Sequence, residues 1–158
     1  MKAASIGGLI AVGMMAVVLV SGPGSHSAAL AAHHAQVALP AERVNMVVVP
    51  GVHLGPDKKM HDAYTPTDLT AVAGQKIVVT VYNYDTGMHS FTAPALGLNV
   101  MIPAARQDGV PAVKTFSFTV KKAGAYRWLC VMPCDDLAKG WAMRHENYMA
   151  GTVTITRA

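Results

Sequence analysis

From residue 45 onward, short runs of β-branched and aromatic residues alternate with turns rich in glycine and proline. The strongest run is KIVVTVYN at 76–83, a composition that is enriched in β-strands. The segment 113–120 alternates strictly, which places Phe116 and Phe118 on one face of a strand. No stretch of this region repeats its apolar residues with the helical period of about 3.6 residues. The pattern therefore predicts an all-β domain, either a sandwich or a barrel.

The same signals predict the remaining strands and the connections between them. Segments that carry several Gly, Pro, Asp or Lys residues without periodicity indicate loops. We expect such loops at 51–66, 85–112 and 131–148. A short strand is expected inside the second of these loops, near 100–102. Further strands are expected at 45–49, 68–73, 125–130 and 152–156.

The first 31 residues differ in composition from the rest of the chain. Lys2 is followed by an uncharged apolar run at 4–20 and by the small-residue step Ala29-Leu-Ala31. This order is typical of a secretory signal peptide, and an uncleaved N-terminal membrane anchor is the alternative. We therefore divide the chain into a signal peptide or anchor at 1–31, a leader at 32–44 and a folded domain at 45–158. The predicted location is outside the cytoplasm, either periplasmic, extracellular or membrane-anchored and facing outward.

Charge and motif content exclude several classes of function. The chain of 158 residues has a formal net charge of +4, and its basic pairs are Lys58-Lys59 and Lys121-Lys122. No basic patch with interleaved aromatic residues is present, so we do not expect a nucleic-acid partner. No Ser-His-Asp order, phosphate loop or His-Glu-x-x-His motif occurs. We therefore expect a binding or carrier protein and not an enzyme.

Two cysteines limit the chemistry that remains. In an oxidising compartment, Cys130 and Cys134 must be joined in a disulfide, bound to a metal or open to oxidation. Cys130 ends a predicted strand, and His89 follows shortly after the strongest one. His145 and Met149 lie just before the last strand. Two imidazoles, a thiolate and a weak thioether form a set that suits both Cu(I) and Cu(II).

These segments resemble the cupredoxin family, the group of plastocyanins and azurins. The Gly-x-Tyr-x-x-x-Cys approach to Cys130 and the Met-x-Gly-x-Val-x-Ile exit from Met149 are similar to the last two strands of that family. The resemblance implies a Greek-key β-sandwich with one type 1 copper ion. It also implies a carrier of single electrons between redox partner proteins in the envelope or membrane. The implied copper ligands are His89, Cys130, His145 and Met149.

The chain also departs from the pattern of the small blue copper proteins. The loop between Cys130 and His145 holds 14 residues, which is longer than in those proteins. Cys130-Val-Met-Pro-Cys134 has the spacing of the dinuclear CuA centre in cytochrome oxidase subunit II, where two thiolates bridge two coppers. That centre places a histidine four residues after the second cysteine, and this chain has Ala138 there. A CuA-like site with Cys134 and two coppers is therefore the alternative to a mononuclear site.

Other interpretations of the same residues stay open. A Cys130–Cys134 disulfide would remove the thiolate, and a copper chaperone or storage protein would also explain the many Met and His residues. Met143 is a further candidate for the axial ligand. Ser90 stands where many relatives have Asn, which puts a hydrogen bond to the thiolate sulfur in doubt. We expect His61, like His53, to be a solvated loop residue.

Overall fold

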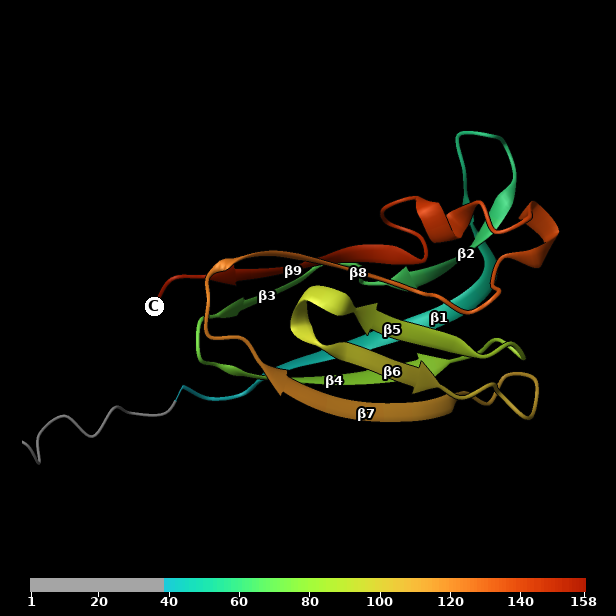
Figure 1. The fold of residues 1–158 in the computed structure, drawn as a ribbon. Helices are drawn as coiled ribbons and strands as arrows, with labels where there is room; N and C mark the ends of the chain where they lie inside the picture. Colours follow the sequence, from blue (N-terminus) through green and yellow to red (C-terminus); the bar gives the residue numbers. More distant parts are fainter. Residues whose placement is uncertain (1–38) are drawn as a thin grey trace, which may run out of the picture. The chain divides into compact units, whose positions relative to one another are not determined.

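The computed structural model describes residues 39–158. The predicted signal or anchor segment at 1–31 lies outside these residues, as does most of the predicted leader. The described chain folds into a sandwich of two β-sheets (Figure 1). The first strand begins at Glu42, inside the segment predicted as leader. Within residues 39–158, no helix is long and apolar enough to cross a membrane.

The first sheet has the strand order β2-β1-β4-β7. β1 pairs parallel with β4 and antiparallel with β2, while β4 pairs antiparallel with β7. A parallel neighbour cannot be reached by a hairpin, so the chain must cross to the other sheet between β1 and β4. The strands of this sheet are β1 (Glu42–Leu54), β2 (Met60–Thr65), β4 (Lys76–Asn83) and β7 (Ala112–Thr119).

The second sheet has the order β3-β9-β8-β5-β6, with a parallel pairing of β3 and β9. Three short 3₁₀ helices, η2 (Pro94–Leu96), η3 (Asp136–Ala138) and η4 (Ala142–Arg144), lie in its connections. The long loop between β8 and β9 lies at the end of the sandwich opposite the C-terminus (Figure 1). The strands are β3 (Leu69–Val72), β5 (His89–Ala93), β6 (Leu98–Ile102), β8 (Gly124–Leu129) and β9 (Ala150–Thr156).

The core lies between the two sheets and follows the alternation of the strands. In β4, Ile77, Val79 and Val81 are buried and face the second sheet, as strand periodicity requires. From the second sheet, Phe91 stacks on Trp128 with ring centroids 4.6 Å apart. Removing these large side chains from water supplies most of the favourable free energy of folding. The all-β sandwich predicted from the sequence is thus confirmed.

Two of the predicted loops were wrong in part. The region 51–66 contains the end of β1 and all of β2, because the pairing shifts register between Val49 and His53 and the strand continues past Pro50-Gly51. The region 85–112 contains β6, which includes the short strand expected near 100–102, and also β5, which was not expected. The helix η2 joins them, with Gly97 at a φ of 65°. The strands β2 and β5 are short and contain several polar residues, so their local signals are weak, and pairing with neighbouring strands stabilises them.

Candidate metal centre

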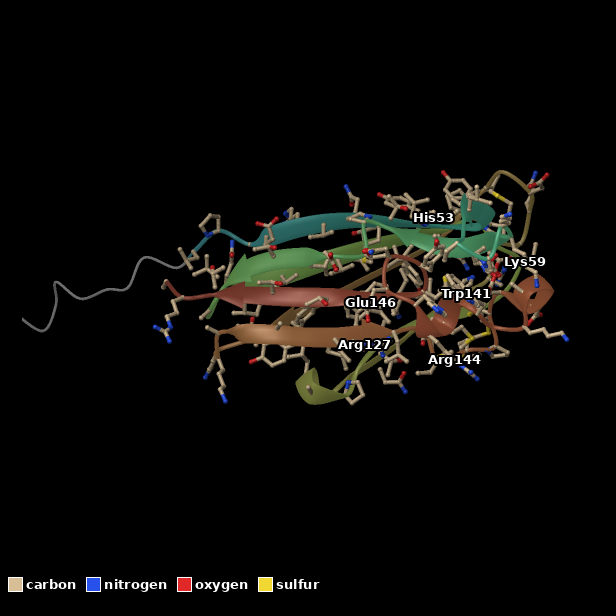
Figure 2. All side chains as sticks on the ribbon, turned by 90° about the horizontal axis from the view of Figure 1, so that it is seen from above. His53, Lys59, Arg127, Trp141, Arg144 and Glu146 are labelled. Carbon is tan, nitrogen blue, oxygen red and sulfur yellow. The ribbon has the colours of Figure 1, made fainter. Side chains whose placement is uncertain are left out.

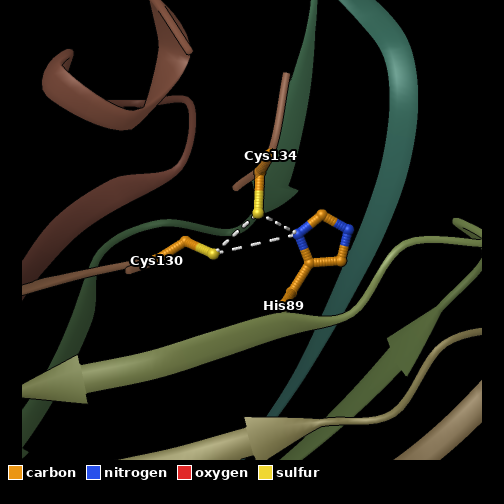
Figure 3. Close-up of side chains that lie close together, drawn as sticks. All are labelled: His89, Cys130 and Cys134. Carbon is orange, nitrogen blue, oxygen red and sulfur yellow. Dashed lines mark hydrogen bonds between the residues drawn. The ribbon is translucent and has the colours of Figure 1, made fainter. Parts of the chain in front are cut away.

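His89 is the first residue of β5, and both of its ring nitrogens have partners. Nε2 lies 2.8 Å from Oδ2 of Asp85, in the turn before the strand. Nδ1 lies 3.0 Å from Sγ of Cys134 and 3.9 Å from Sγ of Cys130. An Nε2–H that donates to the carboxylate leaves the lone pair of a neutral ring on Nδ1. The nitrogen that faces the two sulfurs is therefore the one available to a metal (Figure 3).

The two cysteines come from the loop that follows β8. Cys130 is the residue after the strand, and its N–H donates to the carbonyl of Met149 at 2.8 Å. The two sulfurs lie 2.9 Å apart, longer than the roughly 2.05 Å of a disulfide bond, and both cysteines are free. Both side chains are buried. The site is thus a cluster of one imidazole and two thiols (Figure 3).

The neighbouring groups favour a negative charge on Cys130. Its sulfur accepts a hydrogen bond from the Ser90 N–H at 3.3 Å, and the Ser90 hydroxyl lies 4.0 Å away. The hydrogen bond to the Cys130 sulfur is thus present at this position, and the Ser90 backbone donates it. A hydrogen bond from the Cys134 thiol lowers the pKa of Cys130, with further help from His89 and Ser90, although burial opposes the charge.

The pKa values of Cys134 and His89 are both raised. The hydrogen bond to Cys130, together with burial, raises the pKa of Cys134, so the two sulfurs share one negative charge. Burial opposes the charged form of His89, but the Cys130 sulfur and the Asp85 carboxylate outweigh it and raise the pKa of the ring. The metal-free cluster thus holds protons that a bound cation would displace.

The remaining predicted ligands have different surroundings. Met149 is fully buried in the core and its carbonyl accepts from the Cys130 N–H, while Met143 is partly buried against the same core. His145 is exposed, and its Nδ1–H donates to the carbonyl of Trp141 at 2.7 Å. Its ring stacks on the Trp141 indole with centroids 3.5 Å apart. The structure therefore brings His89 together with Cys130 and Cys134 but leaves His145 outside this cluster.

Two functional neighbours were missed by the sequence reasoning. Asp85 lies four residues before His89, a spacing that could have signalled a carboxylate partner for the imidazole. His61, expected to be a solvated loop residue, is instead fully buried in β2. It is held between Asp57 and Asp135, at 2.9 and 3.0 Å. No local pattern marks this residue, because one of its partners lies 74 positions away in the chain.

A cavity of about 310 Å³ opens beside the cluster. His89 and Cys134 form one part of its wall, and Met60 forms another. The carboxylates of Asp62 and Asp85 also line it. The cavity thus borders one side of the cluster.

The donor set fits a soft transition metal. The three donor atoms lie within 4.8 Å of one another, which makes this a candidate metal group among residues 39–158. Thiolates select copper(I), zinc or iron–sulfur clusters, and imidazole suits copper and zinc. The carboxylate behind His89 is the usual outer partner of a ligating histidine. The arrangement is therefore suited to a metal bound by sulfur and nitrogen.

No protein-family model and no curated protein matches the sequence. Among solved structures, the chain is similar to a multi-copper oxidase from Pseudomonas thermotolerans, with a TM-score of 0.53 and 11% identity over 76% of this chain and 30% of that one. For an auracyanin from Roseiflexus castenholzii the TM-score is 0.44, with 20% identity over 75% of this chain and 99% of that one. For a chain of a heme-copper terminal oxidase it is 0.42, with 19% identity over 57% and 51%.

The similarity to the multi-copper oxidase, with its TM-score of 0.53, bears on the fold alone. The chain spans about half of the terminal oxidase chain and less than a third of the multi-copper oxidase chain. The similarity to the multi-copper oxidase chain extends over 76% of this chain and shows a common fold, which in this chain is the two-sheet sandwich. The described domain has the cupredoxin fold.

Proposed function

We propose that this protein is an exported copper protein that carries single electrons and is not itself an enzyme. His89, Cys130 and Cys134 would hold one copper ion, and the buried Met149 is a further candidate ligand. The supporting observation is the cluster of Nδ1 and two sulfurs, with edges of 2.9, 3.0 and 3.9 Å. Bound copper would supply one-electron chemistry by alternating between Cu(I) and Cu(II).

The protein's own residues would keep this site rigid. Asp85 orients the imidazole from behind, and the Ser90 N–H stabilises the charge on Cys130. The Ser90 hydroxyl in turn accepts from the Val131 N–H at 2.9 Å, which ties β5 to the loop after β8. Side chains held by such contacts move little when the charge at the site changes, so little reorganisation opposes electron transfer. Redox proteins of the envelope or membrane would be the partners.

A CuA-like dinuclear site is the second candidate. The observation that favours it is the separation of 2.9 Å between the two sulfurs, which lets both contact the same ions. Such a site needs a second imidazole, and His145 lies in the same loop. Its ring would have to leave the Trp141 indole to reach the cysteines. The dinuclear site therefore requires a rearrangement of the loop that the mononuclear site does not.

Copper content and colour of the purified protein test the proposal. We expect one copper per chain, intense visible absorption from the thiolate and a reversible redox wave. Cys130→Ser should abolish the absorption, Cys134→Ser should lower the copper affinity and shift the absorption, and His145→Gln should change neither. His53→Gln is a matched control on another exposed histidine.

Three results would overturn parts of the proposal. Two coppers per chain, lost in both His145→Gln and Cys134→Ser, would establish the dinuclear site. A colourless Cu(I) protein without a redox wave would indicate a copper chaperone or storage protein, to which the cavity beside His89 would give access. Metal-free protein that isolates with a Cys130–Cys134 disulfide and takes up no copper would exclude a metal function.

A further inference from the structure

Asp135, the residue after Cys134, is almost completely buried and accepts several hydrogen bonds. Its Oδ2 lies 3.0 Å from Nδ1 of His61 and accepts from the Ala142 N–H at 2.8 Å. Its Oδ1 accepts from the Asp62 N–H at 3.4 Å. The Asp135 carboxylate thereby connects the residue after Cys134 with β2 and with the start of η4.

The backbone of Asp135 is held as firmly as its side chain. Its N–H donates to Oδ2 of Asp62 at 2.8 Å, and its carbonyl accepts from the N–H groups of Ala138 and Gly140, both at 3.0 Å. Its φ is 59°, in the left-handed region that a residue other than glycine adopts at a cost. Because these contacts fix the residue directly after Cys134, the position of the Cys134 backbone depends on them.

His61 is the charge partner that makes a buried carboxylate tolerable at this place. Its ring is fully buried, with Nε2 2.9 Å from Oδ1 of Asp57 and its face stacked on Trp141 at 4.3 Å between centroids. A Cβ on Gly55 would lie 2.7 Å from the ring, so the β1–β2 hairpin closes tightly around it. Figure 2 shows Trp141 at the same end of the domain as Lys59 of that hairpin. A buried carboxylate without such a partner would be strongly disfavoured.

The same contacts extend to the other end of the loop. The Ala142 carbonyl accepts from the N–H of Met149 at 3.3 Å, and the Met149 carbonyl accepts from Cys130. Asp135 therefore connects the backbone at Cys134 with the backbone at Met149 through a single intermediate residue. A change at Asp135 should therefore displace the Cys134 thiol. Its sulfur lies 3.0 Å from Nδ1 of His89, and we expect this distance to change.

We propose that Asp135, held by His61, is a positioning residue that places the Cys134 thiol opposite His89 and Cys130. The proposal rests on the proposed copper function only where copper is the readout. In the metal-free protein the positioning can be tested without copper, because the Cys134 thiol should lose its buried position when either Asp135 or His61 is replaced. The exposed neighbour Asp136 has none of these contacts and should be without effect.

Alkylation of the reduced, metal-free full chain with iodoacetamide tests the positioning, with Cys130 and Cys134 followed separately by mass spectrometry. We expect Asp135→Asn and His61→Gln each to speed the reaction of Cys134 about tenfold or more, because local opening exposes the thiol. Asp136→Asn should leave the rate unchanged. His61→Gln keeps a hydrogen-bond donor, and it carries the test if Asp135→Asn does not fold, as judged by circular dichroism.

The two variants also separate positioning from a simple charge effect. Removing the negative charge of Asp135 favours the Cys134 thiolate, whereas removing the positive charge of His61 disfavours it. Charge alone would therefore move the two rates in opposite directions, and that outcome would overturn the proposal, as would two unchanged rates.

Copper loading distinguishes a failure of this proposal from a failure of the copper function. Where the wild-type protein binds copper, both variants should shift the visible absorption, and Asp136→Asn should not. Unchanged spectra in both variants would contradict the positioning role. A wild-type protein that takes up no copper would contradict the proposed function, and the alkylation rates would still decide the role of Asp135.

Discussion

The two nitrogens of His89 face different chemistry, and Asp85 makes the difference. The carboxylate side chain is only partly buried, while the imidazole is buried almost completely. Oδ1 of Asp85 accepts from the Gly87 N–H at 3.0 Å, while Oδ2 faces the ring of His89. The Asp85 side chain therefore both stabilises the turn and orients the imidazole. A metal that binds Nδ1 therefore meets a ring that is already oriented.

Replacing Asp85 should weaken copper binding without unfolding the protein. We expect Asp85→Asn to lower the copper affinity about 10- to 100-fold, because the amide keeps the turn but removes the charge behind the ring. Competition with a chelator of known affinity measures the change. Asp108→Asn, on an exposed loop, is the control. Equal affinity in Asp85→Asn and the wild type would show that the carboxylate does not orient the ligand.

His61 should make the stability of the metal-free protein depend on pH. Burial opposes its charge, but Asp57 and Asp135 outweigh it and raise the pKa of the ring above the ordinary 6.5. A raised pKa in the folded state stabilises the protein fully below pH 6.5, and this contribution is lost as the pH rises through the folded pKa. Urea unfolding across this range should show the advantage of the wild type over His61→Gln shrinking with rising pH.

The variant isolates His61 from the other titrating groups. Asp62 and His89, whose pKa values are also raised, are present in both proteins and cancel in the difference. A difference that stays constant or grows with pH would mean that His61 is neutral in the folded protein.

At the scale of elements, the loop between β8 and β9 supplies both thiols of the site and the candidate ligand Met149. Its base is closed by the hydrogen bond from Cys130 to Met149, and the turns of η3 and η4 pair part of the backbone in between. The extra length relative to small blue copper proteins is thus ordered structure. The contact of Asp135 with β2 anchors the loop to the first sheet, together with the hydrogen bond from the Tyr64 N–H to the Tyr148 carbonyl at 2.9 Å.

The backbone at Thr67, just before β3, lies close against the paired strands β8 and β9. Trp128 of β8 donates from Nε1–H to the Thr67 carbonyl at 2.8 Å. Opposite Trp128 stands Gly151 of β9, where a Cβ would collide with the same carbonyl. Only glycine fits at this position, because the colliding atom belongs to backbone that cannot rotate away.

Gly151→Ala should therefore destabilise the domain by about 1–3 kcal/mol, as overpacking in a core does. Thermal unfolding of the metal-free protein measures the loss. Thr154→Ala, exposed on the same strand, should change stability by no more than about 0.5 kcal/mol. If the two variants unfold alike, the close approach of Thr67 is not a constraint on this strand.

At the scale of the whole molecule, the sandwich brings distant segments to one end. His89 belongs to a strand that begins after the crossing from β4, and its partner sulfurs lie 41 and 45 positions later in the chain. The core below the site is built from both sheets, with Tyr64 packed edge-on against Trp128 at 5.0 Å between centroids. The tip of the sandwich is held in place by this core, so binding at the tip and folding of the domain are linked.

Copper should consequently stabilise the folded chain as a whole. With free copper at about 100 times its dissociation constant, the expected gain is about 2.7 kcal/mol. We expect added copper to raise the unfolding temperature of the wild type and to leave that of Cys130→Ser unchanged. An equal rise in both proteins would place the stabilising copper at another site.

Periodicity and turn composition determined the class of fold, the inward faces of the strands and the position of Cys130 at the end of a strand. These features are local, since alternation along a strand sets which side chains meet the core. The tertiary structure alone decided that the Cys134 thiol joins His89, that His145 turns to Trp141 and that His61 is buried. Each depends on a loop conformation or a ring orientation that is set by partners elsewhere in the chain. For His61 that partner is Asp135, and no pattern along the sequence records a contact across 74 residues.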